Sequence, residues 1–204
     1  MVALIHPRAF DFVFAFVRGG DVQMKAIALA DWLEAWLRFK TLCDVERGTV
    51  IFDIDDTLVD SREEGIQPVV NIYKLCQKLG FTCSLVTARA EGPENRKETV
   101  RMLHQNRIED WDCLYMMPNA MRNRIKSQDD LRKYVSEYKY DARAKISAKR
   151  TILANIGDMW HDLVKYPLSD AHRQLCDVTP DECAIFFPAS GHHEVAVKLH
   201  GNTG

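Results

Sequence analysis

Two aspartates, Asp53 and Asp55, stand two positions apart directly after the short apolar run of residues 50–52, and Thr57 follows them. An apolar, β-branched run of this kind predicts a buried strand, and alternation along it would turn both carboxylates to the same side. Open α/β sheets place their sites at the carboxyl ends of such strands. One carboxylate could attack phosphorus there, while the other delivers a proton to the leaving group. An acidic turn after a core strand is the alternative interpretation of this segment alone.

Three later segments add further groups of the same chemistry. A second apolar strand ends at the hydroxyl of Thr87, and a charged helical stretch at 138–143 offers Lys139. A third strand ends at Asp158, and Asp162 follows four residues later, so a helical turn would project both carboxylates together. Together with the Asp53 pair they would form a hard, oxygen-rich pocket of the kind that Mg²⁺ prefers. The order of the four segments, three of them at expected strand ends, favours a site over an acidic turn.

These four segments in this order resemble the motifs of the haloacid-dehalogenase-like (HAD) phosphohydrolases. The resemblance is strongest to the acid-phosphatase branch, which carries D-x-D-D/E-T, then Y-K-x-x-x-R, then an ending like N-I-G-D-Q-W-S-D-L. This chain reads Asn155-Ile-Gly-Asp-Met-Trp-His-Asp-Leu163 at the ending, and the similarity covers roughly residues 21–187. It departs from the branch at His161, where a small residue is usual, and at Met117, where arginine is expected.

The resemblance implies a role for each catalytic candidate. Asp53 would be the nucleophile that forms an aspartyl phosphate, and Asp55 would protonate the leaving oxygen and then activate water. Thr87 would hydrogen-bond a phosphoryl oxygen. Lys139 would neutralise charge on Asp53 and on the phosphoryl group.

The resemblance also implies a metal site. Asp53, the backbone carbonyl of Asp55 and Asp158 are expected to hold Mg²⁺, with Asp162 acting directly or through water. In the family, an aspartate at the position of Asp55 separates phosphohydrolases from dehalogenases, so its presence favours phosphate as the substrate group.

Four residues near the motifs have more than one interpretation. Lys145 and Lys149 also precede the last motif, but Lys139 has the spacing and the Y-K-x-x-x-R context of the branch. Arg89 could bind substrate or be an exposed arginine at the start of a helix. Asp56, which stands where many relatives have glycine, is interpreted as a solvated or capping carboxylate.

Elsewhere the chain alternates apolar strand patterns with helical patterns. Strands are expected at 49–52, 81–86, 113–116, 151–156 and 183–187, and helices at 22–39, from 68 to Gly80, at 95–104 and from about Ser127. This alternation predicts an α/β fold with three layers and a doubly wound, mostly parallel sheet, the HAD-like Rossmannoid arrangement.

Only residues 60–67 separate the first motif from the next helix, and a segment of this length is too short for a cap domain. A single domain over 1–204 is expected, with an N-terminal helical segment at about 1–45, a catalytic core at about 46–190 and a tail at about 191–204.

Composition places few further limits on function. The 204 residues are 47% hydrophobic and 27% charged with a net charge of −2, which is ordinary for a soluble globule and gives no electrostatic argument for nucleic acid or membrane. The six cysteines form no C-x-x-C pair and are expected to be reduced, with a disulfide between Cys176 and Cys183 as the alternative. The first residues lack a secretory pattern and no apolar run could span a bilayer, so an intracellular, cytoplasmic location is expected.

We therefore expect a Mg²⁺-dependent phosphomonoesterase whose partner is a phosphorylated substrate and not a membrane. A nucleic-acid end phosphatase is the alternative within catalysis, favoured by the open site and by the basic segment 122–126, although a solvated loop is the preferred interpretation of that segment. A non-catalytic binding protein on the same fold is the alternative outside catalysis, and the complete set of motif residues argues against it. Homo-oligomerisation stays open.

Overall fold

A computed structural model describes residues 2–5, 14–17, 31, 33–41, 48–163, 184–186 and 193–199. One sheet runs through these residues in the strand order β1-β2-β7-β8-β6-β3-β4-β5. The strands are β1 (Val2–Ile5), β2 (Phe14–Val17), β3 (Thr49–Phe52), β4 (Thr82–Ala90), β5 (Cys113–Met117), β6 (Ile152–Gly157), β7 (Ala184–Phe186) and β8 (His193–Lys198). The labelled helices are α2 (Gln67–Lys78), α3 (Pro93–Gln105), α4 (Asn119–Arg122), α5 (Gln128–Ser147) and α6 (Trp160–Leu163). Residues 31 and 33–41 are also helical.

The strands that carry the motifs form the parallel part of the sheet. β3 pairs in parallel with β4 on one side and with β6 on the other, while β4 continues to β5 and β6 to β8. The ladders β1–β2, β2–β7 and β7–β8 are antiparallel. The predicted α/β fold with a mostly parallel sheet is confirmed. β3 therefore has a hydrogen-bonded neighbour along both edges, which fixes the residue that follows it.

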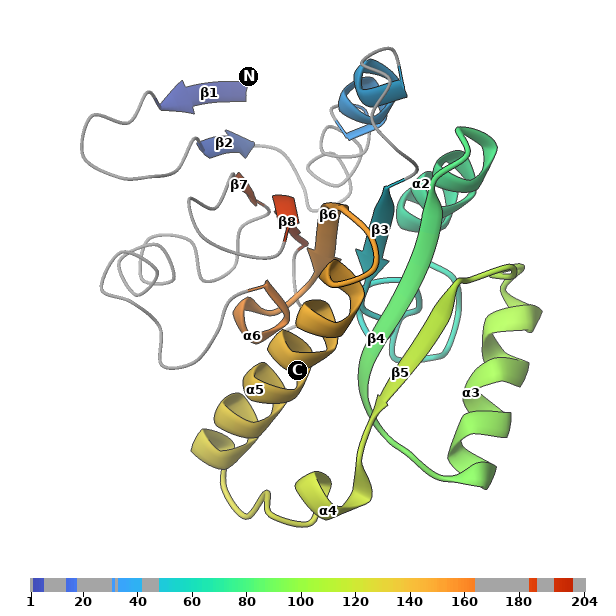
Figure 1. Cartoon of the computed structure of the whole chain (residues 1–204), viewed down its shortest axis with the longest axis vertical. Coiled ribbons are helices and arrows are strands. Elements are labelled where there is room, and N and C mark those ends of the chain that lie inside the picture. The colour runs from blue at the N-terminus through green and yellow to red at the C-terminus, as the bar shows by residue number, and fades with distance from the viewer. Residues whose placement is uncertain are drawn as a thin grey trace.

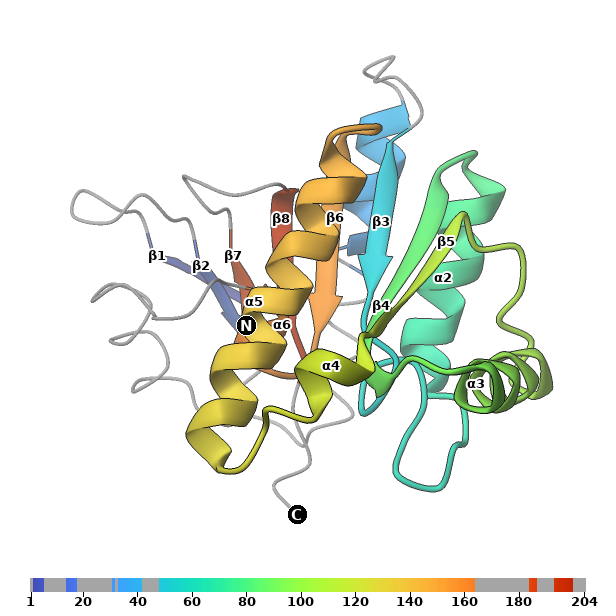
Figure 2. The same cartoon turned by 60° about the horizontal axis from the view of Figure 1, so that its bottom comes forward.

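Helices cover both faces of the parallel strands (Figures 1 and 2). The alternation along β3 divides the core between them, because Val50 and Phe52 belong to the cluster formed with α2, α3 and residues 33–37. The ring of Phe52 meets that of Tyr73 edge-on, at 5.4 Å between centroids. Ile51 belongs instead to the cluster formed with α5, which includes Ala142. These two clusters make the three layers that the sequence predicts.

Two helix ends follow local signals in the sequence. α5 begins where expected, since the side chain of Ser127 accepts a hydrogen bond from the backbone N–H of Asp130. α2 ends at Lys78, two residues before Gly80, whose φ of 85° lies in the left-handed region. The N–H of Gly80 bonds to the carbonyl of Gln77 and that of Phe81 to the carbonyl of Cys76, which is a Schellman motif.

The structure differs from the sequence expectation toward both ends of the chain. β8 lies in the residues assigned to a tail and pairs in parallel with β6, inside the sheet. β1 and β2 lie in the segment expected to be helical; of the helix expected at 22–39, residues 31 and 33–39 are described and are helical, and the helix continues to 41. The expected strand at 183–187 is β7. That the chain forms a single domain stays a prediction.

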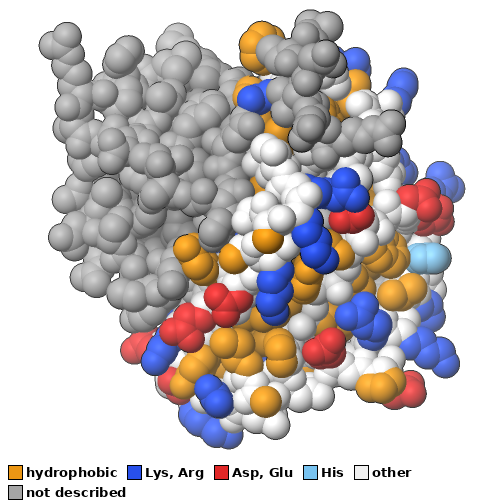
Figure 3. Space-filling model, viewed as in Figure 1, with side chains coloured by type: hydrophobic (Ala, Val, Ile, Leu, Met, Phe, Trp, Pro, Cys, Tyr) orange, Lys and Arg blue, Asp and Glu red, His pale blue; other side chains and the backbone are white. Residues whose placement is uncertain are grey.

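Two expectations about chemistry outside the site are only partly covered by the described residues. Cys76, Cys83 and Cys113 carry free thiols, whereas the alternative pair Cys176 and Cys183 lies outside the described residues. Among the described helices, none combines the length and the apolar character that crossing a bilayer requires. Acidic and basic side chains are interspersed over the described part of the face seen in Figure 3, in keeping with the small net charge.

Candidate active site

Three buried aspartates meet where β3 and β6 end. Asp53 directly follows β3, and its N–H donates to the carbonyl of Ile156 in β6 at 2.9 Å. Asp158 directly follows β6, and Asp162 lies in α6. One carboxylate oxygen from each of the three lies within 4.8 Å of the others. Hard oxygen donors at this spacing fit a divalent cation such as Mg²⁺.

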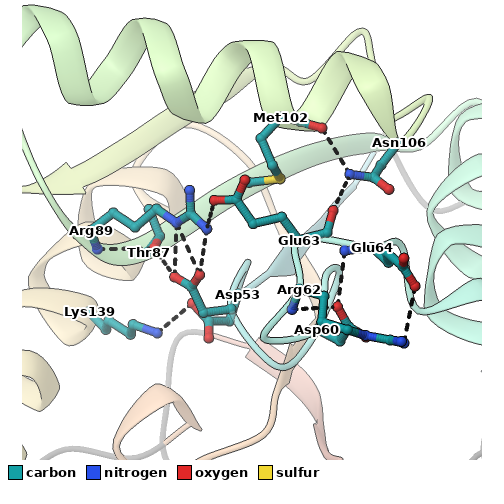
Figure 4. Close-up of polar contacts among 11 residues, drawn as sticks. Asp53, Asp60, Arg62, Glu63, Glu64, Thr87, Arg89, Met102, Asn106 and Lys139 are labelled. Carbon is teal, nitrogen blue, oxygen red and sulfur yellow. Dashed lines mark hydrogen bonds and ion pairs between the residues drawn. The ribbon is translucent and has the colours of Figure 1, made fainter.

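Lys139 reaches this cluster from α5. Its Nζ donates to Asp53 Oδ1 at 2.7 Å and to Asp162 Oδ1 at 2.6 Å, and the side chain is only 3% exposed. Lys145 and Lys149, the alternatives for the catalytic lysine, are exposed. Figure 4 shows Lys139 pointing toward Asp53. The structure thus places Lys139 beside the expected nucleophile, whereas its catalytic role stays a prediction.

Asp162 is held by its backbone as well as by its carboxylate. Its Oδ2 accepts a hydrogen bond from the N–H of Met159 at 2.9 Å. Its carbonyl accepts hydrogen bonds from the Arg143 guanidinium and, at 3.0 Å, from the Asn155 side chain, and both donors are buried. Both residues stand in the motifs quoted above, but the motifs did not predict that these side chains would hold the carbonyl of Asp162. The sequence did contain a signal for such contacts, namely a guanidinium and an amide within otherwise apolar, buried stretches. Buried polar groups need hydrogen-bond partners, so these two side chains were expected to have them.

A close approach between Gly157 and Asp162 makes a first prediction. A Cβ added at Gly157 would lie 2.6 Å from Asp162 Cβ and 2.8 Å from its Oδ2, so Gly157→Ala must displace the carboxylate. We expect kcat/KM to fall by about 100-fold, because a shift of about 1 Å in a site residue costs that much. The matched control is Gly92→Ala, whose added Cβ would meet the side-chain nitrogen of Asn95 at an ordinary 3.7 Å. Equal activities of the two variants would contradict this role of Gly157.

Burial perturbs the protonation of two of the three carboxylates, and their neighbours contribute. Burial raises the pKa of Asp53 to about 7, with Lys139 opposing the rise and Asp162 adding to it. Burial also raises the pKa of Asp158 to about 9, and the charges of Asp162 and Asp53 contribute. Burial alone would lower the pKa of Lys139, but Asp162 and Asp53 outweigh it and raise that pKa. One ammonium therefore faces three carboxylates, and a divalent cation among them would favour the ionised form of each.

Asp55 lies apart from this cluster, with its side chain turned to Arg89. Arg89 Nη2 donates to Asp55 Oδ1 at 2.7 Å and Nε donates to the same oxygen at 3.0 Å, while Thr87 Oγ1 donates to Oδ2 at 3.3 Å. The interpretation of Arg89 as an exposed residue at a helix start is wrong. β4 extends to Ala90, so Arg89 is a strand residue, and its guanidinium is paired with Asp55. A metal contact through the backbone carbonyl of Asp55 stays a prediction.

Little chain lies over the site among the described residues. The connection from β5 to α5 contains only the four-residue α4, and residues 60–66 contain no helix, so neither of these two connections contains a cap domain. Met117, at the position where arginine was expected, is fully buried in the cluster next to α5. The basic side chains of Arg122, Arg124 and Lys126 are exposed.

Comparisons with known proteins add family information to this geometry. A family model described as HAD superfamily, subfamily IIIB (acid phosphatase) matches residues 59–188. The matched stretch begins after Asp53 and Asp55 and includes Thr87, Lys139 and Asp158. Acid phosphatase 1 of Solanum lycopersicum is 27% identical over 186 residues, which cover 78% of this chain and 69% of that protein.

One solved structure gives a much weaker match. It is the NH3-dependent NAD synthetase from Campylobacter jejuni in complex with nitrate, at 12% identity and a TM-score of 0.32. The match covers 68% of this chain and 57% of the synthetase chain. A similarity this low carries no argument about fold or function.

Proposed function

This chain belongs to subfamily IIIB of the HAD superfamily, the acid phosphatases, and we propose that it is a Mg²⁺-dependent phosphomonoesterase that works through an aspartyl-phosphate intermediate. Its phosphatase class follows from the family and from the related tomato acid phosphatase. The observation that carries the finer proposal is the contact between Lys139 Nζ and Asp53 Oδ1 at 2.7 Å, beside two further buried aspartates.

In the first step, the Asp53 carboxylate attacks phosphorus in line, and the bond to the leaving oxygen breaks. Two contacts support Asp53 as the attacking group. Its backbone is tied to Ile156 across the β3–β6 ladder, and its side chain is oriented by Lys139. The lysine also places a positive charge next to the oxygens on which negative charge gathers, which lowers the barrier.

Asp55 acts as the general acid in the first half-reaction and as the general base in the second. It protonates the leaving oxygen in the first, and in the second it takes a proton from the water that hydrolyses the aspartyl phosphate and releases inorganic phosphate. Its position two residues after Asp53, on the solvent side of the buried cluster, supports this role. Thr87, bonded to Asp55, is the candidate donor to a phosphoryl oxygen. Arg89 orients the Asp55 carboxylate through both of its oxygens.

Asp53, Asp158 and Asp162 are the residues that would hold the cation, and their carboxylates fit it in chemistry and in spacing. Bound Mg²⁺ would supply positive charge that offsets the charge on the phosphoryl oxygens and on the carboxylates. With that charge balanced, Asp53 is kept ionised and available for attack.

Metal removal tests this proposal. A chelator is expected to abolish hydrolysis of an aryl phosphate, and added Mg²⁺ to restore it. Asp158→Asn keeps the side-chain size and removes one anionic ligand, so the Mg²⁺ concentration for half-maximal activity should rise by at least about tenfold. Asp129→Asn, at an exposed position at the start of α5, is the control and should behave as the wild type. Full activity in chelator would refute the metal requirement.

Stability gives a second measurement on the same variant. The pKa of Asp158 is raised from 3.8 to about 9, so the metal-free folded state holds a proton that the unfolded state releases. Metal-free stability should therefore fall as pH rises from about 4 toward 9. Asp158→Asn should flatten this dependence in thermal unfolding and raise the melting temperature at neutral pH. An unchanged pH profile would show that Asp158 does not hold a proton in the metal-free folded state.

A further inference from the structure

The loop of residues 60–66, which follows the first motif, is held in a fixed shape by Asp60. Its Oδ1 accepts hydrogen bonds from the N–H of Arg62 at 2.8 Å and of Glu64 at 3.0 Å. Its Oδ2 accepts from the Arg62 guanidinium at 3.0 Å. A carboxylate that accepts hydrogen bonds from two backbone N–H groups of one turn fixes the turn around itself. Glu63, in the middle of this turn, adopts a φ of 61°.

Asn106, at the end of α3, holds the same loop from outside. Its Nδ2 donates to the carbonyl of Glu63 at 2.8 Å, and its Oδ1 accepts from the N–H of Gly65 at 2.7 Å. Its Nδ2 also donates to the carbonyl of Met102, which anchors the amide to the helix (Figure 4). The backbone at Glu63 is therefore fixed from two sides, which fixes the position of its Cα and limits where its side chain can reach.

The Glu63 carboxylate lies next to the guanidinium of Arg89, the group that orients Asp55. Glu63 Oε1 lies 3.6 Å from Arg89 Nη2, the same nitrogen that donates to Asp55 Oδ1 at 2.7 Å. Figure 4 shows the Glu63 side chain pointing toward this guanidinium. Two carboxylates share one cation, so the three groups carry a net charge of −1. The side chains of Asp55 and Glu63 are 49% and 47% exposed, whereas that of Arg89 is 21% exposed, so solvent meets mainly the two carboxylates.

The next step rests on the proposed function. A leaving oxygen that receives a proton from Asp55 must lie within hydrogen-bond reach of it. The phosphoryl group occupies the buried side, next to Asp53, so the remainder of the leaving group extends along the exposed side. Glu63 is the neighbouring charge on that side, and the fixed loop keeps its backbone from moving away.

We propose that Glu63 determines specificity, by favouring phosphomonoesters with a neutral or cationic leaving group over those whose leaving group carries a further negative charge. The physical reason is Coulomb repulsion between the Glu63 carboxylate and an anionic leaving group, which Arg89 does not offset because Asp55 already engages it. A phosphorylated nucleic-acid end, whose leaving group is a polyanion, is then a poor substrate.

Three aryl phosphates that differ in one charged substituent test this inference. They are the para-methyl, para-carboxylate and para-aminomethyl phenyl phosphates, the last carrying an ammonium at neutral pH. The quantity measured is the ratio of kcat/KM for the cationic ester to kcat/KM for the anionic ester. Leaving-group reactivity differs among the esters, but it is the same for every variant and cancels when ratios are compared.

Glu63→Gln is expected to lower this ratio by about three- to tenfold, since one charge at the mouth of a hydrated site acts through a high effective dielectric. The ratio of the wild type should also fall as salt is raised. Glu64→Gln is the matched control, because Glu64 is the next residue of the same loop and its carboxylate is paired with Arg62 instead. Its ratio should equal that of the wild type.

The neutral ester separates failure of this inference from failure of the proposed function. If the wild type hydrolyses para-methylphenyl phosphate but Glu63→Gln leaves the ratio unchanged, or Glu64→Gln lowers it equally, the role of Glu63 is refuted and the phosphatase proposal stands. If the wild type prefers the anionic ester, the role of Glu63 is refuted as well, and the exposed basic segment 122–126 becomes the determinant. If the neutral ester is not hydrolysed, both proposals fall.

Discussion

Asp53→Asn is expected to lower kcat by at least about 10⁴-fold, because the amide keeps the shape of the side chain but cannot attack phosphorus. The fold should survive, since the substitution removes one of three crowded carboxylates and Lys139 keeps its contact with Asp162. Single-turnover assays should also show no acid-stable phosphorus on the variant protein, whereas the wild type is expected to show it. Circular dichroism checks the fold.

The control for this substitution is Asp141→Asn, at an exposed position on α5, which should retain full activity. Asp53→Asn with near-normal turnover would overturn the assignment of the nucleophile, whatever the metal requirement proves to be. Loss of both activity and helical signal would instead mean that the buried carboxylate is needed for folding, and the covalent intermediate would then be sought on the wild type by rapid quench.

Lys139→Ala has the second-largest expected effect, and it acts on both activity and stability. Removing the ammonium leaves Asp53 and Asp162 buried without their shared partner, which costs about 3–5 kcal/mol of folding free energy. Activity should fall by about 10³-fold or more, because the charge on the phosphoryl oxygens loses its neutralising group. Thermal unfolding and kcat measured below the melting temperature give the two quantities.

Two controls and one rescue make the lysine experiment decisive. Lys145→Ala and Lys149→Ala remove the same charge from exposed positions and should change little. Lys139→Ala combined with Asp162→Asn removes one of the two uncompensated carboxylates and should recover stability without recovering activity. Inactive Lys145 or Lys149 variants beside an active Lys139 variant would show that the Y-K-x-x-x-R resemblance points to the wrong lysine.

Local sequence patterns are enough to predict the parallel part of the fold. The apolar runs that end at Asp53, Thr87 and Asp158 read as strands because buried parallel strands are nearly continuous in apolar residues. Carboxyl ends of parallel strands meet at one edge, so the convergence of Asp53 and Asp158 could be expected once the strands were placed. Ser127 and Gly80 set helix ends through contacts within a few residues, which sequence reasoning can see.

What could not be predicted depends on partners far apart in the chain. β8 was missed because a six-residue strand next to Gly191 has little local signal, and its pairing with β6 is decided by the sheet. The partner of Arg89 could not be read from its neighbours, since Asp55 lies 34 residues earlier. The same holds for Arg143, whose contact with the Asp162 carbonyl spans 19 residues. The spacing of a motif indicates that its residues lie in one site, but it does not show which atoms of that site each side chain contacts.

The strand order also sets when the enzyme becomes complete during its synthesis on the ribosome. Thr49 of β3 pairs with Thr82 on one side and with Ile152 on the other, so the nascent chain exposes one edge of β3 until β6 has emerged. An unpaired edge is a template for pairing with another chain. A chain interrupted at Arg150 would contain Asp53 and Lys139 but neither aspartate that follows β6. Such a fragment would be inactive and prone to aggregation. Once β6 has emerged, the unpaired edge passes to β6 itself, and it stays open until residues 193–198 have emerged and β8 pairs with it.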